Sequence, residues 1–137
     1  MIDRLLLIAD DLTGSLDAAV QFERAGVSTF VTMRDATETP GADVSVLAVD
    51  IESRHLPPGE AARRVERCVE AAVRAGIRRF YKKTDSTLRG NIGAELAAML
   101  RATGVQELYF VSALPDAGRI TRGGVQYVDG VPLHGSR

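Results

Sequence analysis

The sequence predicts an α/β fold of three layers, with a mostly parallel sheet and helices on both faces, as in Rossmann-like domains, followed by a β-hairpin. Short apolar runs alternate with longer amphipathic runs along most of the chain, which is typical of strand–helix–strand units. The apolar residues of the first run, residues 4–9, are consecutive, as in a strand that is buried on both faces. Four of the apolar runs end in clusters of polar residues, as strands do when their ends form a binding site.

Length and composition favour a single folded domain over residues 1–137. The chain contains 45% hydrophobic and 26% charged residues, which is not the composition of a disordered protein. Its formal net charge is −1 and its charges are interspersed, so we expect no nucleic-acid partner. No apolar run approaches the roughly 20 residues of a membrane span, so we expect a cytoplasmic protein with no membrane partner.

The first strand is expected at residues 4–9 and an amphipathic helix at residues 15–26. Gly26 lies where a left-handed residue commonly ends a helix. Apolar residues of this helix recur at helical spacing, so we expect one of its faces to contact the sheet. That face comprises Leu16, Ala19 and Val20.

Two further strands are expected at residues 27–33 and 43–50. The segment 34–43 between them is polar, contains proline and glycine, and is the candidate for a flexible connector. Because it is too short to hold a crossover helix, we expect one of the two strands to lie at an edge or to run antiparallel.

The clearest helix is expected at residues 58–76. Glu60 and Arg64 can pair across one turn, and Gly76 ends the helix. Cys68 is the only cysteine, which excludes an internal disulfide and a thiolate metal cluster, and we expect it to pack in the core. The residues expected to face inward are Ala61, Val65, Cys68 and Ala72, with Ala62, Val69 and Val73 beside them.

The remaining elements are expected to be two strands, a helix between them and a terminal hairpin. The strands are residues 77–81 and 106–114. The hairpin spans residues 123–135 and turns at Asp129 and Gly130, a dipeptide that favours tight turns between strands. The intervening helix is expected to face inward through Ile92, Leu96, Met99 and Leu100.

Polar residues follow four of the expected strands, at residues 9–15, 50–55, 82–91 and 112–119. The carboxyl ends of parallel strands meet at one edge of the sheet, where open α/β sheets bind their ligands. A domain that needed only turns would use fewer ionisable groups at these positions. We therefore expect a binding site at this edge.

Asp10 and Asp11 follow the first strand directly and precede a helix. One carboxylate could cap that helix, although Thr13 and Ser15 compete for the role. Two adjacent carboxylates repel each other unless a divalent cation, a substrate hydroxyl or a lysine neutralises one of them. Capping and a functional role for the pair are both open at this level.

The segment 81–91, YKKTDSTLRGN, has the strongest signal for an anion site. Arg89 can hold a carboxylate or a phosphate with two hydrogen bonds, and Gly90 lets the backbone approach a ligand closely. Lys82 and Lys83 supply compact positive charge. Alternation along a strand sends these two lysines to opposite faces, so only one of them is expected to reach a given ligand.

The same segment offers hydroxyl groups and a carboxylate. Thr84, Ser86 and Thr87 can donate to an oxygen-rich ligand. Asp85 could act as a general base, as a metal ligand or as an internal ion-pair partner. The segment lacks the glycine pattern of a phosphate-binding P-loop. The plain alternative is a solvated loop whose lysines flank a strand and discourage aggregation.

Arg54 and Arg119 would bring two further cations to this edge, although each alone could equally be an exposed surface arginine. His55 and His134 are far apart in sequence and have no cysteine beside them, so no zinc or other metal site is indicated. The residues therefore predict an edge suited to a small polyhydroxy acid or a phosphate compound. They name no reaction.

Four motifs in this order resemble the N-terminal domain of four-carbon acid sugar kinases: ADDLTGSLD, SRHLPP, KKTDSTLRGNIGAEL and GRITRGGVQYVDGVPLH. The resemblance covers essentially the whole chain. It implies an enzyme that uses ATP to phosphorylate a sugar acid such as threonate, erythronate or a 3-oxo form. The chain departs from the family pattern, which has aspartate, proline, phenylalanine and threonine, at Glu52, Ser112, Leu114 and Ile120.

The resemblance also implies where a sugar acid would bind. Arg89 or Arg54 would hold its carboxylate. Asp10 or Asp11 would orient or deprotonate the attacking hydroxyl, and Asp85 is the third catalytic candidate. The substrate-binding candidates are Ser53, Arg54, Lys82, Lys83, Thr84, Ser86, Arg89 and Arg119.

In that family a second, C-terminal domain binds the nucleotide. ATP and Mg²⁺ are therefore expected mainly outside residues 1–137, in a domain absent from this sequence or in a separate chain, and a homo-oligomer is compatible with the resemblance. The alternative is a stand-alone module that binds a sugar acid without catalysis, from a truncated or split kinase. A response-regulator receiver is disfavoured, because no helix fits between the second and third strands and no lysine follows the fifth.

Overall fold

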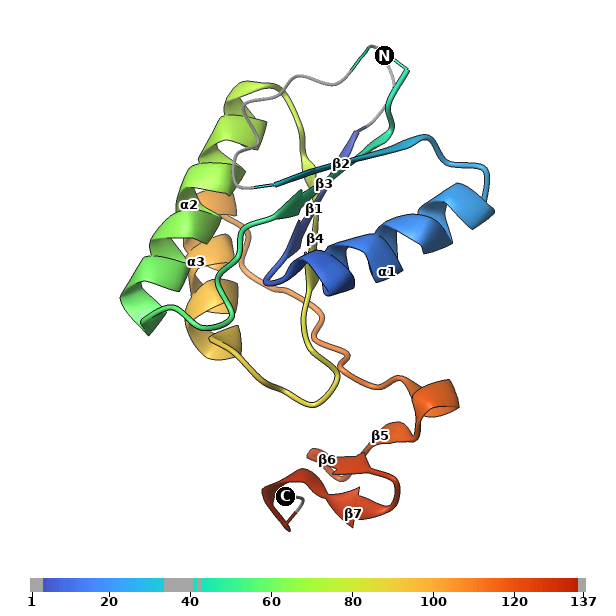
Figure 1. Ribbon diagram of the computed structural model, residues 1–137. Helices are drawn as coiled ribbons and strands as arrows, with labels where there is room; N and C mark the ends of the chain where they lie inside the picture. The colour runs from blue at the N-terminus through green and yellow to red at the C-terminus, as the bar shows by residue number, and fades with distance from the viewer. Residues whose placement is uncertain (1–3, 34–40, 42, 136–137) are drawn as a thin grey trace.

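The expected layers are present in the computed structural model, which describes residues 4–33, 41 and 43–135. The elements of the main layers are β1 (Leu5–Ala9), α1 (Leu12–Arg24), β2 (Thr29–Met33), β3 (Val46–Asp50), α2 (Pro58–Arg74), β4 (Arg79–Lys83) and α3 (Ile92–Thr103). The four strands are parallel and lie in the order β2-β3-β1-β4. α1 covers one face of this sheet, and α2 and α3 cover the other (Figure 1).

The two strands joined by the candidate connector, β2 and β3, are parallel, and β2 lies at the edge of the sheet. The edge position is confirmed, and the antiparallel alternative is wrong. The connector itself, residues 34–43, lies almost wholly outside the described residues. β4 begins two residues later than expected and extends through Lys82 and Lys83. Both lysines are therefore strand residues with fixed and opposite directions.

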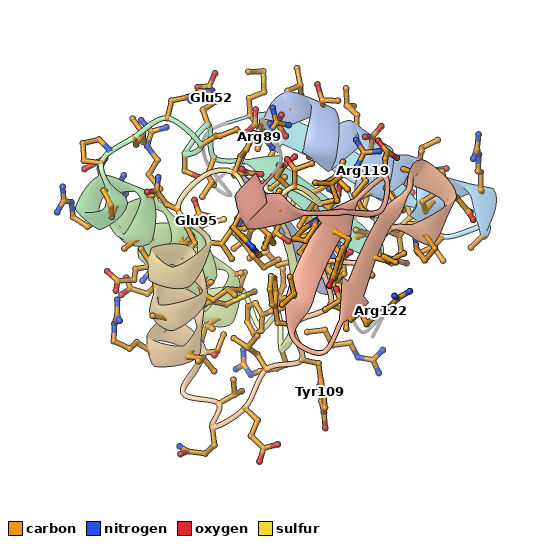
Figure 2. All side chains as sticks on the ribbon, turned by 90° about the horizontal axis from the view of Figure 1, so that it is seen from below. Glu52, Arg89, Glu95, Tyr109, Arg119 and Arg122 are labelled. Carbon is orange, nitrogen blue, oxygen red and sulfur yellow. The ribbon has the colours of Figure 1, made fainter. Side chains whose placement is uncertain are left out.

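The strand expected at residues 106–114 is wrong. In the described structure this segment forms only an isolated bridge, between Leu114 and Arg119. A strand needs a hydrogen-bonding partner, and a cavity separates this segment from the edge of β4. The side chain of Tyr109 instead points away from the protein (Figure 2). A strong β pattern alone did not decide the structure of this segment.

The terminal hairpin is confirmed, and it belongs to a second, antiparallel sheet. Asp129 and Gly130 have left-handed φ angles of 49° and 83° in the two-residue turn of the hairpin. Figure 1 shows this sheet beyond the carboxyl ends of the parallel strands. Its elements are the 3₁₀ helix η1 (Pro115–Ala117), β5 (Arg119–Arg122), β6 (Val125–Val128), β7 (Val131–Pro132) and the 3₁₀ helix η2 (Leu133–Gly135).

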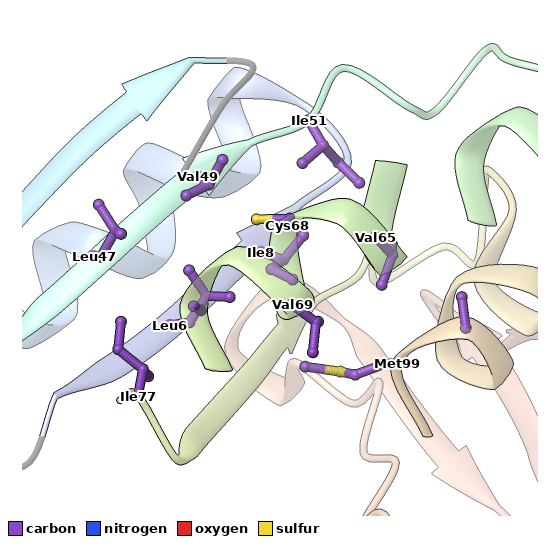
Figure 3. Close-up of a cluster of buried hydrophobic side chains, with 12 residues drawn as sticks. Leu6, Ile8, Leu47, Val49, Ile51, Val65, Cys68, Val69, Ile77 and Met99 are labelled. Carbon is purple, nitrogen blue, oxygen red and sulfur yellow. The ribbon is translucent and has the colours of Figure 1, made fainter. Parts of the chain in front are cut away.

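β1 is buried on both faces, as its consecutive apolar residues predict. Leu6 and Ile8 point toward α2 and α3 and join the larger hydrophobic cluster (Figure 3). Leu7 and Ala9 point toward α1 and join the smaller cluster. The period of two along a strand divides these side chains between two cores. Residues of neighbouring strands in the same register therefore face the same helices.

The helix expected at residues 58–76 is confirmed as α2. Cys68 is buried and packs in the larger cluster. Arg64 Nε lies 3.8 Å from Glu60 Oε1 across one turn, and Gly76 has a left-handed φ of 86° just beyond the helix. The buried residues of α2, which form the expected stripe, are Ala61, Val65, Cys68, Val69 and Ala72.

The inward face expected for the first helix is wrong at two of its three positions. Ala19 is buried, but Leu16 and Val20 are exposed on the outer side of α1. The helix contacts the sheet through its smallest side chains, which let its backbone lie close to the strands. These buried residues are Gly14, Ser15, Ala18 and Ala19.

The inward face expected for α3 is fully buried only at Met99. Ile92, Leu96 and Leu100 are half-buried, and the last two line the cavity beside β4. Glu95 is buried on the same helix, where a charged residue was not expected. None of the described helices has both the length and the apolar character needed to cross a membrane.

Candidate functional site

Three connecting segments meet at the carboxyl end of the parallel sheet, as the strand-end rule predicts. Asp10 and Asp11 follow β1, residues 51–57 follow β3, and residues 84–91 follow β4. The backbone joins the first two segments, since the amide of Ser53 donates to the carbonyl of Asp10 at 3.0 Å. The segments after β1 and β3 are therefore joined by the backbone alone, independently of their side chains.

Arg54 contacts both aspartates, a partner that was not among the neutralising groups considered from the sequence. Its Nε and Nη2 donate to Asp10 at 2.8 and 3.1 Å, and its Nη1 donates to Asp11 at 2.5 Å. Asp10 is buried and the Arg54 side chain is only 13% exposed, so this contact lies mostly away from water. The guanidinium is thus occupied by two carboxylates.

Asp11 also caps α1, which confirms the capping interpretation for one member of the pair. Its Oδ1 accepts a hydrogen bond from the amide of Gly14 at 2.9 Å. The helix therefore begins at Leu12, earlier than expected, and neither Thr13 nor Ser15 is its cap residue. One oxygen of Asp11 thus serves the helix while the other contacts Arg54.

Gly90 brings the segment after β4 against this cluster. Its φ of 90° lies in the left-handed region, which favours glycine. A β-carbon here would lie 3.1 Å from Asp10 Oδ2 and 3.6 Å from Arg54 Cγ. The backbone of Gly90 thus lies close to the Asp10–Arg54 pair.

Asp85 and Arg89 form a second ion pair. Arg89 donates from Nε and Nη2 to the two oxygens of Asp85, at 2.8 and 2.9 Å, and the Thr87 hydroxyl donates to the same carboxylate. The Arg89 hydrogen bonds hold the pKa of Asp85 well below its usual range, so this carboxylate is a weak base. Of the three roles considered for Asp85, the structure shows the internal ion pair.

Lys82 and Lys83 point to opposite faces of the sheet, as strand alternation predicts. Lys82 points toward α3, where its buried Nζ lies 2.8 Å from Glu95 Oε2. Lys83 points toward α1, and its Nζ lies 3.7 Å from where a β-carbon on Gly14 would be. Its Nζ donates to the carbonyl of Thr84 at 2.9 Å. Lys82 is thus committed to an internal ion pair, whereas Lys83 lies half-buried at the start of α1.

Glu95 is a residue of this edge that sequence reasoning missed. Its buried carboxylate pairs with Lys82 and accepts a hydrogen bond from the Ser53 hydroxyl, so it joins α3, β4 and the segment after β3. One signal was available, because Glu95 lies three residues after Ile92 and four before Met99, on the inward stripe of its helix. A carboxylate on such a stripe indicates a buried ion pair.

Two side-chain amides, also missed, tie further segments to the site. Asn91 donates its Nδ2 to the carbonyls of Ser53 and Leu56, at 3.1 and 2.8 Å. Gln126, on β6, donates its Nε2 to the carbonyl of Ser86 at 2.9 Å. The antiparallel sheet is thereby attached to the segment that carries Arg89.

Arg119 lies on β5 of the antiparallel sheet rather than at the end of a parallel strand (Figure 2). Its Nη1 donates to the nearby carbonyl of Ala117. Within the described residues, the ion pairs of the site do not include Arg119. Thr84 and Ser86, by contrast, are half-buried on the same segment as Arg89.

Asp50 ends β3 as a buried carboxyl group at the same edge. Burial raises the pKa of Asp50, and the negative charges of Glu52, Asp11 and Asp10 act in the same direction. The amide of Glu52 donates to Asp50 Oδ1 at 2.8 Å and partly offsets this effect. Asp50 therefore holds a proton more readily than an exposed aspartate.

The described residues do not fit a Mg²⁺ site at this edge. Across residues 4–33, 41 and 43–135, no three side chains of histidine, cysteine, aspartate or glutamate are grouped so that they could hold a metal ion. The adjacent pair Asp10 and Asp11 already receives the hydrogen bonds of Arg54.

A family model described as the sugar-binding N-terminal domain matches residues 5–137. D-threonate kinase from Cupriavidus necator is 44% identical over 136 residues, which cover 96% of this chain and 31% of that protein. D-erythronate kinase from Heliobacterium modesticaldum is 39% identical over 132 residues, which cover 94% of this chain and 30% of that protein. The chain thus spans less than a third of the length of these relatives.

Solved structures show the same fold. A domain of unknown function from Bordetella bronchiseptica, crystallised with bound citrate as a domain-swapped dimer, has a TM-score of 0.89 at 40% identity, over 96% of this chain and 34% of that one. A protein from Haemophilus influenzae has a TM-score of 0.86 at 30% identity, over 96% of this chain and 33% of that one. The likeness therefore extends over nearly the whole of this chain.

Proposed function

The chain belongs to the family of sugar-binding N-terminal domains, and from that membership we propose that it binds a four-carbon sugar acid at the carboxyl end of its parallel sheet. The observation that carries the proposal is the exposed guanidinium of Arg89, on the same segment after β4 as the hydroxyl residues Thr84 and Ser86. Relatives are named as kinases of D-threonate and D-erythronate, which are four-carbon acids rich in hydroxyl groups.

In the proposed complex, Arg89 holds the carboxylate of the sugar acid. A guanidinium binds a carboxylate through two parallel hydrogen bonds, and the side chain of Arg89 is 66% exposed, so a ligand can reach it. Lys83, the last residue of β4, adds positive charge near the start of α1. The hydroxyls of Thr84 and Ser86 donate to oxygens of the ligand. The citrate bound to the Bordetella bronchiseptica relative, a carboxylic acid, is in line with an anion site.

Three residues contribute to the proposed site by holding its segments in position through internal contacts: Arg54, Ser53 and Lys82. Arg54 holds Asp10 and Asp11 in place, and Asp11 is the more exposed member of that pair. We assign to Asp11 the task of orienting the substrate hydroxyl that receives phosphate. Asp85 is not assigned as the base that deprotonates this hydroxyl, because its lowered pKa makes it a weak base.

For phosphate transfer, we propose that ATP and Mg²⁺ bind to a nucleotide-binding domain outside residues 1–137, on the same chain or a separate one. The proposal rests on the named kinases, of which this chain covers less than a third. Mg²⁺ would there neutralise charge on the phosphates. The part played by residues 1–137 is to bind and orient the acid. A homo-oligomer is also proposed, since the Bordetella bronchiseptica relative forms a domain-swapped dimer.

Isothermal titration calorimetry of the 137-residue chain tests the binding proposal. We expect heat of binding with D-threonate or D-erythronate, with a Kd of about 1 mM or lower. Threitol, a four-carbon polyol without a carboxylate, is the matched control and should give no heat, because it cannot bind the guanidinium of Arg89. No heat with either acid at about ten times that concentration would contradict the proposal.

A further inference from the structure

A cavity of about 730 Å³ lies along the outer edge of β4. One wall is formed by β4 and α3, and the opposite wall is formed by residues 105–114. One end, beside Thr84 and Ser86, adjoins the proposed sugar-acid site, and the rest is mainly apolar. Its apolar lining comes from both walls and includes Phe80, Leu96, Met99, Leu100, Leu108 and Phe110.

Both walls present backbone without a strand partner. β4 pairs with β1 on one side, and among the described strands none pairs with its other side. Across the cavity, residues 106–113 belong to no strand, although their sequence, QELYFVSA, has a strong β pattern. The open edge of a sheet is the place where a further strand can add through main-chain hydrogen bonds.

The cavity has the size of one short strand. A strand rises about 3.3 Å per residue, neighbouring strands lie about 4.8 Å apart and packed layers about 10 Å apart, so one strand residue occupies roughly 160 Å³. A volume of about 730 Å³ therefore corresponds to roughly four or five strand residues. β4, which forms the wall, is itself five residues long.

The wall across the cavity carries apolar side chains that the described structure leaves uncovered. Tyr109 is 93% exposed, and Val111 is exposed as well. Figure 2 shows Tyr109 directed outward from the segment. Contiguous exposed apolar residues mark an interaction site more often than a finished surface. Residues 106–113 therefore have the composition of a β-strand but pair with no other strand in the described structure.

We propose that the cavity receives one further polypeptide strand, which hydrogen-bonds to β4 on one side and to residues 106–113 on the other. The inserted strand is four or five residues long, contains no proline, and places apolar side chains toward α3, where Phe80 and Met99 lie. With this strand in place, residues 106–113 would form the β-strand that their sequence predicts. The strand order would then be β4, the inserted strand, and residues 106–113. This inference does not depend on the identity of the small-molecule ligand.

The proposed occupant is a segment other than the described residues of this chain, and we assign it to polypeptide outside residues 1–137. Among the described residues, β5, β6 and β7 are paired in their own sheet, and residues 106–113 form a wall of the cavity. Longer relatives supply further polypeptide, because the match with this chain covers only 31% of D-threonate kinase from Cupriavidus necator. Two backbone walls on either side of a strand-sized space favour such a segment over a small molecule.

Peptide binding tests the inference. The probes are overlapping short synthetic peptides that cover the unmatched part of the Cupriavidus necator D-threonate kinase, and binding to the 137-residue chain is measured by fluorescence anisotropy. We expect one apolar segment to bind, and a single proline within it to weaken binding at least about tenfold. Hydrogen exchange with the bound peptide should slow at the amides of residues 79–83 and 106–113 together.

A pair of proline variants serves as an internal control. Neighbouring amides of an extended segment point to opposite sides, so only one of Tyr109→Pro and Phe110→Pro should weaken peptide binding. Equal effects of the two variants would contradict the proposed geometry. The inference is overturned if no peptide binds, or if both sets of amides are already protected in the free chain, which would show closure by residues 106–113 or by a second copy. D-threonate binding by calorimetry is unaffected by either outcome, so the two proposals fail separately.

Discussion

The two arginine–aspartate contacts at the strand ends differ in how far the arginine is buried and in how far apart the partners lie in the sequence. Arg54 is 13% exposed and contacts two carboxylates that lie 44 and 43 residues away in sequence. Arg89 is 66% exposed and contacts one carboxylate, four residues away. The first contact joins distant segments of the fold, whereas the second lies within one short segment and leaves its guanidinium accessible.

The burial of each ion pair determines how much it contributes to stability and whether its arginine is accessible to a ligand. Removing one partner of a buried ion pair leaves an uncompensated charge and is strongly destabilising. An exposed ion pair contributes about 0–1 kcal/mol, because water screens it. Arg54 is therefore suited to holding other groups in position, and Arg89 is suited to exchanging its partner for a ligand.

The largest expected effect is that of Arg54→Ala, a loss of about 3–5 kcal/mol in the free energy of unfolding. Asp10 would remain buried without a cation, and urea denaturation at neutral pH measures the loss. Arg64→Ala is the matched control, because Arg64 is also partly buried and donates to the carbonyls of Ile51 and Glu52, but its removal leaves no buried carboxylate without a cation. We expect a loss of about 1 kcal/mol there, and equal losses for the two variants would contradict the role of Arg54.

An intermediate effect is expected for Glu95→Gln, a loss of about 2–3 kcal/mol. Glutamine keeps the shape of the side chain and can still bind the Ser53 hydroxyl, but the buried Lys82 loses its opposite charge. The double variant Glu95→Gln/Lys82→Met removes both charges and should recover part of the loss. Additive losses in the same denaturation experiment would show that the two side chains are not coupled.

The smallest effect on stability is expected for Arg89→Ala, about 1–2 kcal/mol, because Asp85 is only 11% exposed but keeps its hydrogen bonds from the Thr87 hydroxyl and from the amides of Thr87 and Arg89. The same variant should lose the calorimetric heat with D-threonate, because the proposed partner of the ligand carboxylate is gone. Arg101→Ala is the matched control, since Arg101 is 61% exposed and also has one ion pair at 2.8 Å, with Glu66. Unchanged binding by Arg89→Ala would show that another group holds the carboxylate.

The helix with the strongest amphipathic pattern was predicted well, and elements whose packing depends on the shape of the neighbouring elements were not. α2 was predicted with its buried stripe, because Val65 and Cys68 recur at helical spacing on a long, strongly amphipathic segment. Leu16 and Val20 have the same spacing on α1, yet they are exposed, because small residues form the contact with the sheet. Residues 106–113 have a strand pattern but no pairing partner among the described residues.

The candidate site divides in the same way. Strand order placed the segments of Asp10, Arg54 and Arg89 at one edge, and that placement could be argued from polar residues at strand ends. The partner of each charged side chain could not be predicted in this way. Arg54, for example, lies 43 residues from Asp11 in sequence and contacts it only in the folded protein. Glu95 was missed because its partners come from β4 and the segment after β3.

The sequence alone determines the alternation of strands and helices, the turn at Asp129 and Gly130, and the opposite directions of Lys82 and Lys83. These features follow from local backbone geometry, which repeats every two or 3.6 residues. Only the tertiary structure decides that Lys82 meets Glu95 and that Arg54 meets Asp10 and Asp11. Such partners depend on the packing of strands and helices that are distant in the chain, and burial makes it costly to leave one of these charges unpaired.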